Sequence, residues 1–450
     1  MEDYNNDNRQ NNPDVGIDMP EQENTQGQVT IREKILDTIS GLGFNINNVI
    51  GAAIFVNPSR VWRLVQSPGT ALMFWLAGGF VSLFCSLIYV ELGTRFPSGS
   101  GEQKYLDETF KKFPNFGHIF TFVMITIILP GSIIADTYVS AEYLLFAIQR
   151  NENEGDQNIY FGQDFGKLRA LAVALLLIIT LYHIYSNKLA ININKALALI
   201  KFLALLIISL IGLAKLRESG FKDKWMGIFN NTPIDDEPQR SVLEQIGSYG
   251  NAMLKVIFSY NGWNNLNYST EELNKPDRSM KYSTIFSVII CLILYILTNA
   301  AYISAIDHNA INSNDTMIVS FGRTFGEPGK TLIYLIVSIS AFGCVGSMVF
   351  MGSRVINYAA RTEFIPKFSN SLYKWHKKFD TPSNALAVQF LYCSVLIIFF
   401  PEGKSLFSFF SSMSAYLAVV FYGASAICLF VLKEDQKEAQ YENFKTPLIL

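Results

Sequence analysis

The sequence predicts an all-α polytopic membrane protein. Half of its 450 residues are hydrophobic and only 16% are charged, whereas about a quarter of the residues of a soluble domain are charged. Apolar runs of roughly twenty residues, long enough to cross a bilayer as a helix, recur along the chain. These observations exclude a soluble globular class, and the net charge of −2 argues against nucleic acid as a partner.

The two ends of the chain are polar and frame an apolar core. Residues 1–34 are rich in Asn, Gln, Asp and Glu with almost nothing to bury, which predicts a disordered acidic cytoplasmic tail. The membrane core is expected over residues 35–432. Residues 433–450 turn polar again, which predicts a cytoplasmic segment, and they end in FKTPLIL, a sequence typical of the entrance to a further span.

Ten spans are expected in the core, and they divide into two sets of five. The first set, repeat one at about 37–213, has spans near 37–58, 69–91, 115–149, 169–186 and 189–213. The second set, repeat two at about 249–432, has spans near 249–272, 283–306, 331–358, 383–400 and 405–432. The third span is too long for an upright helix and contains Pro130 and Asp136.

Each set opens with a span that carries the signal of a broken helix. The first span has Gly41, Gly43 and three Asn before Gly51-Ala52-Ala53, and the sixth reads KVIFSYNGWNNLNYSTEE. A lipid-immersed helix keeps every backbone group paired, so these runs favour unwound segments that line a cavity, as in many secondary transporters. The alternative is a helix contact in which Gly permits close approach and Asn bonds sideways. Breaks at matching places in both sets predict an inverted repeat with discontinuous helices 1 and 6.

Basic residues predict how the chain lies in the membrane. Lys and Arg gather in the segments 95–112, 275–281 and 361–378. Cytoplasmic loops are enriched in these residues, so the N-terminus is expected in the cytoplasm.

Several stretches together resemble the amino acid–polyamine–organocation superfamily. They are VIGAAIFVNP (49–58), ELGTRFP with SGEQKYL (91–106), FSYNGWNNLNYSTEE (258–272), LTNAAYIS (297–304) and FGCVGSMVFMGSRVINYAARTEFIP (342–366). The set is most similar to the L-type amino acid transporter (LAT) branch, and within it to the fungal methionine permeases. The resemblance implies twelve helices, a five-plus-five inverted repeat and unwound helices 1 and 6. Ten spans are visible here, so the last two are expected to be missing.

The resemblance also implies where a free amino acid binds. Its carboxylate would meet the backbone of Gly51, Ala52 and Ala53, where the family usually has GSG or GTG, and this departure predicts a lower carboxylate affinity or a narrower substrate range. Its ammonium would meet carbonyls around the break, at Ile50, Phe258, Ser259 and Asn261. Phe258 would also be an aromatic lid and gate. Gly262, Trp263 and Asn264 follow, and the last two would surround the substrate side chain or form the inner gate, with plain core packing as the alternative for Trp263.

Three charged residues inside the spans are further candidates. Lys201 lies about twelve residues into the fifth span, which is mid-bilayer at 1.5 Å per residue. By resemblance it stands where sodium-coupled relatives hold a cation, so loss of its proton is one candidate for proton coupling. The alternative is a snorkelling lysine. Asp136 and Lys255 have similar predicted depths, which favours an outer ion pair at the entrance. Otherwise Asp136 recognises a cationic side chain or carries a proton.

The function that follows is secondary active transport of neutral L-amino acids, methionine foremost, by alternating access. Proton symport and exchange both stay open, so protons are a conditional partner beside the free amino acid and the lipid bilayer. The alternative is an amino acid sensor that does not translocate its ligand. An enzyme finds no support, because HExxH, GxSxG and clustered acid pairs are absent from the spans. No cofactor or metal is expected. The segment 150–168 has no Cys, so no disulfide-linked heavy chain is expected, and the predicted location is the plasma membrane.

Overall fold

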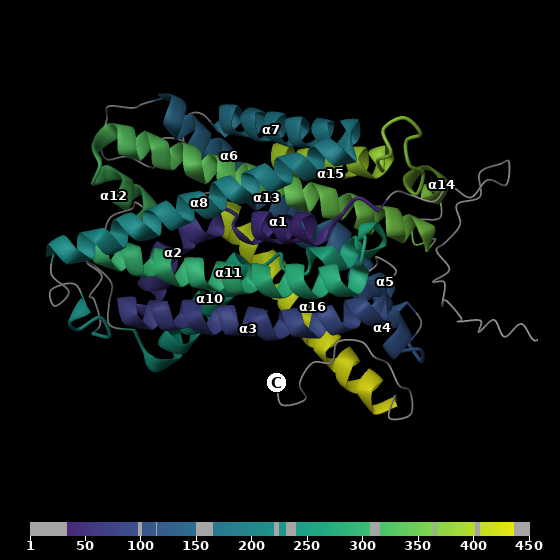
Figure 1. Cartoon of the computed structure of the whole chain (residues 1–450), viewed down its shortest axis with the longest axis horizontal. Coiled ribbons are helices and arrows are strands. Elements are labelled where there is room, and N and C mark those ends of the chain that lie inside the picture. Colours follow the sequence, from purple (N-terminus) through teal and green to yellow (C-terminus); the bar gives the residue numbers. More distant parts are fainter. Residues whose placement is uncertain are drawn as a thin grey trace, which may run out of the picture. The chain divides into compact units, whose positions relative to one another are not determined.

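Helices make up nearly all of the backbone that the computed structural model describes (Figure 1). The described residues are 34–97, 101–113, 115–149, 165–219, 225–230, 240–306, 316–362, 364, 367–400 and 406–435. Besides helices they contain an isolated parallel bridge between Leu36 and Leu273. The all-α prediction is confirmed. The predicted tail before Lys34, the predicted end after Asp435 and most of the cysteine-free segment 150–168 lie outside the described residues.

The helices follow the predicted spans closely. The first half of the chain forms α1 (Thr38–Val49), α2 (Ala53–Val65), α3 (Pro68–Arg95), α4 (Glu102–Thr109), α5 (Phe116–Val123), the π-helical η1 (Met124–Ile128), α6 (Leu129–Gln149), α7 (Phe165–Tyr185) and α8 (Asn187–Ser219). The second half forms α10 (Val242–Tyr260), the 3-10 turns η2 (Asn265–Tyr268) and η3 (Thr270–Glu272), α11 (Pro276–Ala305), α12 (Met317–Arg323), α13 (Gly326–Arg361), α14 (Ser369–Leu372), α15 (Ser383–Phe399) and α16 (Leu406–Asp435).

Among the described residues, fewer helices than the ten predicted are long and apolar enough to span a membrane. Among the described residues seven helices are long and apolar enough, and the bent pair α1–α2 is an eighth. The remaining two predicted spans are present in a weaker form. The helix α15 is apolar but has 17 residues, and α10 carries Glu244 and Lys255 and gives way to 3-10 turns. The division into two repeats stays a prediction.

Burial separates the central helices from those that face lipid. In α13, 72% of the span window is buried inside the protein, against 33% in α3, α7 and α8. These outer helices expose large apolar side chains such as Phe80, Ile178 and Leu203, which a hydrocarbon surrounding tolerates. The helix α1 lies among α8, α11 and α13, and α10 packs against α2, α3 and α16 (Figure 1). The two predicted broken helices are therefore held inside the bundle.

The first break separates α1 from α2. Asp37 caps the start of α1, where its carboxylate accepts a hydrogen bond from the N–H of Ser40 at 2.7 Å. The helix stops at Val49, and α2 starts at Ala53 with its axis bent by 41°. Ala52 lies in the break, as predicted.

The second break follows α10. A capping box between Ser241 and Glu244 starts this helix. The helix ends at Tyr260, and Gly262 has a φ of +113°, which favours glycine. The chain continues in 3-10 turns, so this predicted break is present too.

The third predicted span is a continuous run of α5, η1 and α6 that changes its winding midway. Pro130 has no N–H and cannot bond to the carbonyl of Thr126 four residues earlier. That carbonyl instead accepts the hydroxyl of Tyr392 at 3.0 Å. The π-helical turn η1 at Met124–Ile128 fits a site where the regular ladder is interrupted.

Candidate functional site

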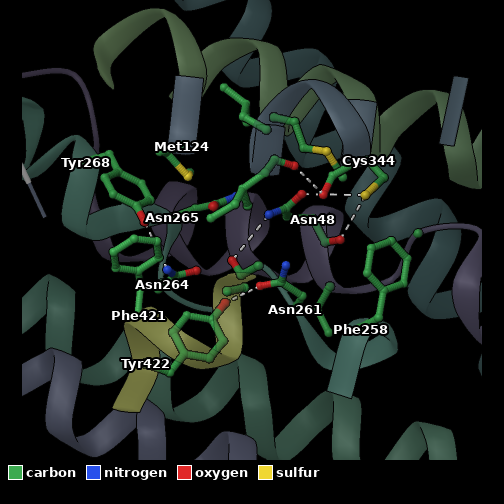
Figure 2. Close-up of a pocket in the computed structure, with 18 of the residues that line it drawn as sticks. Asn48, Met124, Phe258, Asn261, Asn264, Asn265, Tyr268, Cys344, Phe421 and Tyr422 are labelled. Atoms are coloured by element: carbon green, nitrogen blue, oxygen red, sulfur yellow. Dashed lines mark hydrogen bonds between the residues drawn. The ribbon is translucent and has the colours of Figure 1, made fainter. Parts of the chain in front are cut away.

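Both breaks line one cavity inside the bundle (Figure 2). The space free of protein atoms measures about 660 Å³, open solvent at its mouth included. Asn48 and Gly51 reach it from the first break, and Asn261 and Gly262 reach it from the second. The described residues that line it include two carboxyl groups, of Asp136 and Glu102, and no Lys, Arg or His. The described part of the wall is therefore acidic and carries no basic side chain.

The carboxylate of Asp136 occupies the first break. Its Oδ1 accepts a hydrogen bond from the backbone N–H of Ala52 at 3.0 Å, and Asp136 is only 2% exposed. Gly51 lies beside it, because a Cβ on Gly51 would come within 3.4 Å of both carboxylate oxygens and 2.9 Å of Cys344 Sγ. A helix start offers unpaired N–H groups to an anion. The chain thus supplies its own anion where the substrate carboxylate is predicted to bind.

The predicted outer ion pair between Asp136 and Lys255 is wrong. In the described parts of the chain the cation that acts on Asp136 is Lys201, which is fully buried like Asp136 itself. The charged neighbour of Lys255 is Arg60, a like charge. Depth along the bilayer does not fix the direction in which a side chain points, and α6 directs Asp136 toward α1.

Lys201 links the first break to its neighbours. Its ammonium donates to the carbonyl of Asn47 at 2.7 Å. The side-chain amide of Asn47 in turn bonds to Asn194 Oδ1 at 2.6 Å, the carbonyl of Gly343 at 2.7 Å and Ser347 Oγ at 2.9 Å. These contacts bring α1, α8 and α13 together around one buried charge. A part in coupling stays a prediction.

Two side chains join the breaks to each other. The hydroxyl of Tyr295 on α11 lies 2.6 Å from the carbonyl of Val49 and 3.0 Å from that of Ser259. The Asn48 amide lies 3.4 Å from the carbonyl of Gly262. A Cβ on Gly262 would come within 2.3 Å of that amide nitrogen, so only glycine fits the approach. The two half-sites are held as one unit.

Three of the carbonyls predicted to bind an ammonium already have donors. The carbonyl of Ile50 accepts the hydroxyl of Ser340 at 3.1 Å. The carbonyl of Ser259 accepts the hydroxyl of Tyr295. The carbonyl of Phe258 accepts the N–H of Asn261 at 3.1 Å. A carbonyl has a second lone pair, so each can still take a ligand proton.

The predicted residues divide into those that line the cavity and those that do not. Lining it are Gly51, Ala53, Asp136, Phe258, Asn261, Gly262 and Asn264, whereas Ile50, Ala52, Lys201, Lys255, Ser259 and Trp263 are not part of its lining. Trp263 is packed with ring centroids 5.0 Å from Tyr89 and 5.1 Å from Tyr422, which matches the packing alternative. Substrate binding by any of them stays a prediction.

Sequence reasoning missed part of the wall. The missed residues are Asn48, Val49, Glu102, Phe120, Met124, Ile128, Leu129, Ser132, Asn265, Tyr268, Cys344, Met348, Ala418, Phe421 and Tyr422. Tyr268, Phe421 and Tyr422 cluster near Asn264 (Figure 2). Glu102 carried a signal, because it is a charged residue within the loop motif SGEQKYL. Most of the others are apolar residues of ordinary spans and carry none.

Two solved transporters have the same fold. Mhp1, a nucleobase-cation-symport-1 family transporter in a closed conformation with bromovinylhydantoin bound, has a TM-score of 0.56 and 11% identity over 92% of this chain and 82% of its own. MhsT in complex with L-phenylalanine has a TM-score of 0.61 and 14% identity over 89% of each chain. At such identities the likeness concerns the fold alone, and it confirms the predicted fold class.

Relatives by sequence carry names of amino acid transport. The b(0,+)-type amino acid transporter 1 of Mus musculus is 26% identical over 430 residues, which are 95% of this chain and 81% of that protein. The large neutral amino acids transporter small subunit 2 of Rattus norvegicus is 29% identical over 381 residues, 84% and 67% of the two chains. The high-affinity methionine permease of Saccharomyces cerevisiae is 27% identical over 377 residues, which are 83% of this chain and 62% of that protein.

The family itself follows from a match along almost the whole chain. The amino acid permease family matches residues 36–450. That range includes both breaks and the cavity between them. The match confirms the predicted superfamily, which consists of transporters and not of enzymes. The chain belongs to the amino acid permease family of the amino acid–polyamine–organocation superfamily and is an integral membrane amino acid transporter.

Proposed function

We propose that this transporter carries neutral L-amino acids, methionine foremost, by alternating access between the two sides of the membrane. The observation that carries the proposal is the capped first break, where the carboxylate of Asp136 holds the N–H of Ala52. A zwitterion has charges of both signs and can replace this contact without leaving either protein group unpaired.

The exchange of partners has two parts. The substrate carboxylate takes the N–H of Ala52, and the substrate ammonium takes the released carboxylate of Asp136. The carbonyls near Ile50 and Ser259 complete the ammonium site with their second lone pairs. Lys201 keeps its charge balance with Asp136 throughout. A substrate that lacks either charge leaves one buried group without a partner, which costs about 1–3 kcal/mol.

Apolar side chains favour a neutral and flexible substrate side chain. Phe120, Met124, Ile128, Leu129 and Met348 line the cavity. Thioethers and aromatic rings make favourable contacts with one another, which supports methionine over smaller amino acids. The relatives named as a large neutral amino acids transporter and a methionine permease agree with this choice.

The experiment is counterflow with the purified full chain in liposomes. Vesicles are loaded with unlabelled methionine, and accumulation of external labelled methionine is measured against each common amino acid as competitor. We expect methionine and other bulky neutral amino acids to compete, and glutamate to be inert. Binding of labelled methionine without accumulation would instead identify a sensor. Proton symport and exchange both agree with counterflow, and the predicted site of action is the plasma membrane with the N-terminus in the cytoplasm.

A further inference from the structure

A second carboxyl group lines the cavity and takes no part in the proposed substrate contacts. Glu102 is the first residue of α4, in the connection between the spans α3 and α5. It is 1% exposed, whereas Glu108 on the same helix is partly exposed and pairs with Lys104. Burial of a carboxyl group costs free energy, so the burial of Glu102 on a short connecting helix calls for an explanation.

The hydrogen bonds of Glu102 all reach one of its two oxygens. Its Oε1 lies 2.8 Å from the hydroxyl of Tyr89, 2.9 Å from that of Tyr268 and 3.3 Å from the amide nitrogen of Asn264. Its Oε2 is buried and has no hydrogen-bond partner. Tyr89 belongs to α3, whereas Asn264 and Tyr268 belong to the unwound stretch after α10. One side of the carboxyl is thus tied to the second break and the other is free.

Among the residues that the structure describes, the groups that face Glu102 carry no positive charge. The titratable groups that act on it are the hydroxyls of Tyr89, Tyr105, Tyr268 and Tyr422, from α3, α4, η2 and α16. Of the basic residues on neighbouring helices, Arg95 on α3 and Lys433 on α16 pair with Glu91, and His118 on α5 bonds to Asn115. Within the described residues no Lys, Arg or His pairs with Glu102. Burial raises the pKa of the Glu102 carboxyl above its usual range.

We infer that Glu102 is the group that binds and releases the proton coupled to amino acid transport by this protein. The inference rests on the proposed transport function. The proton adds to Oε2 to give the neutral acid and leaves from the same atom, and no other bond forms or breaks. Tyr268 and Asn264 bond the carboxylate oxygen from the segment that alternating access must move, so the position of the second break and the charge of Glu102 depend on each other.

A cationic substrate side chain is the other use of a free carboxylate oxygen. The burial of Oε2 favours the proton, because a proton needs no room while an ammonium needs its own volume. The two uses differ in what competes for transport. Lysine competes in the second case alone.

The test compares Glu102→Gln with Glu108→Gln on the same helix, both in proteoliposomes. Gln keeps the size of the side chain and cannot ionise. A gradient of one pH unit, acid outside, supports about tenfold accumulation of methionine for one coupled proton. We expect this accumulation in the wild type and in Glu108→Gln, and its loss in Glu102→Gln with counterflow retained.

A second variant guards against a fold defect in the first. Tyr268→Phe keeps the carboxyl and removes one donor to Oε1. This change disfavours the charged form, so the half-maximal pH of gradient-driven uptake should move upward.

Three results would overturn the inference. If Glu102→Gln keeps gradient-driven uptake at the wild-type level, Glu102 is not the coupling group. A wild type that exchanges methionine but ignores the gradient would refute coupling while leaving the proposed function intact. Competition by lysine that Glu102→Gln abolishes, with the gradient response retained, would assign the carboxylate to a substrate side chain. Failure of counterflow with every amino acid would refute the proposed function itself.

Discussion

Asp136 on α6 accepts a hydrogen bond from the backbone N–H of Ala52 at 3.0 Å, and this contact fills the start of α2 with a carboxylate of the protein itself. The resemblance to the family implied that a substrate carboxylate binds there. Both statements hold if the substrate displaces Asp136 and then neutralises it. Under the proposed function, the contact would make the site selective for molecules that carry an anion and a cation together.

Replacing Asp136 by Asn should weaken the recognition of the substrate ammonium and not that of the substrate carboxylate. Asn keeps the shape and removes the charge that would meet the ammonium. We expect the affinity for methionine to fall at least about tenfold, since a hydrogen bond to a charged group contributes about 1.5–3 kcal/mol. The analogue 4-(methylthio)butanoate, which lacks the ammonium, should bind the variant better than the wild type. Competition against labelled methionine measures both, and the exposed Asp277→Asn is the control. Equal losses for the two compounds would contradict the proposed exchange of partners.

Gly262→Ala should disrupt the contact between Asn48 in the first break and Gly262 in the second. The residue has a φ of +113°, and the new Cβ would lie 2.3 Å from the amide nitrogen of Asn48. We expect a loss of about 1–3 kcal/mol in stability from the backbone strain alone. Gly250→Ala is the matched control, because nothing lies within 4 Å of its Cβ position in α10. Thermal unfolding in detergent measures both variants, and equal melting temperatures would show that the break tolerates a side chain.

Two neighbouring ion pairs should differ sharply in how much they contribute to the free energy of unfolding. Glu272 and Arg354 are 2.8 Å apart with side chains 8% and 6% exposed, whereas Glu271 and Arg361 are 3.0 Å apart and 24% and 21% exposed. Removing one partner of a buried pair costs about 3–5 kcal/mol, because the other charge stays buried. The more exposed pair contributes about 0–1 kcal/mol. Unfolding of Glu272→Gln and Glu271→Gln tests this order, and similar losses would contradict it.

Glu102 should also give the stability of the protein a pH dependence of known sign. Because its pKa is raised in the folded protein above the usual 4.5, the folded state holds a proton that the unfolded state releases. The contribution of Glu102 to the stability of the folded protein is then fully present below its pKa in the unfolded state. It is lost as the pH rises through its raised pKa in the folded state. The melting temperature of the wild type minus that of Glu102→Gln should fall from pH 4.5 upward. A difference that is flat or rises with pH would show that the carboxyl is charged in the folded state.

The two breaks were predictable because their signal is local. Glycine and asparagine within an apolar run are unfavourable in a lipid-facing helix whatever surrounds it, and the breaks at Ala52 and Gly262 follow from residues within one or two turns. The same is true of the ends of most spans, which turn from apolar to polar within a few residues.

The partners of the buried charges were not predictable in the same way. The depth of Asp136 can be counted along the sequence, but its direction around the helix depends on every turn before it. The pairing with Lys255 rested on depth alone and was wrong. Glu102 lies on a connecting helix without hydrophobic periodicity, so no pattern related it to Tyr268 or to Asn264, which are far away along the chain.

The π-helical turn at Met124–Ile128 determines which way Asp136 faces. An α-helix advances by roughly 100° for each residue, so a turn that accommodates one extra residue rotates everything after it by about that angle. Within this turn the carbonyl of Thr126 accepts the hydroxyl of Tyr392 and not an N–H of Pro130, which has none. Shortening the turn by a single residue would swing the carboxylate toward a different neighbour, and the amide of Ala52 would lose its anion. A local irregularity in winding, eight residues before the acid, thus decides the electrostatics of the cavity.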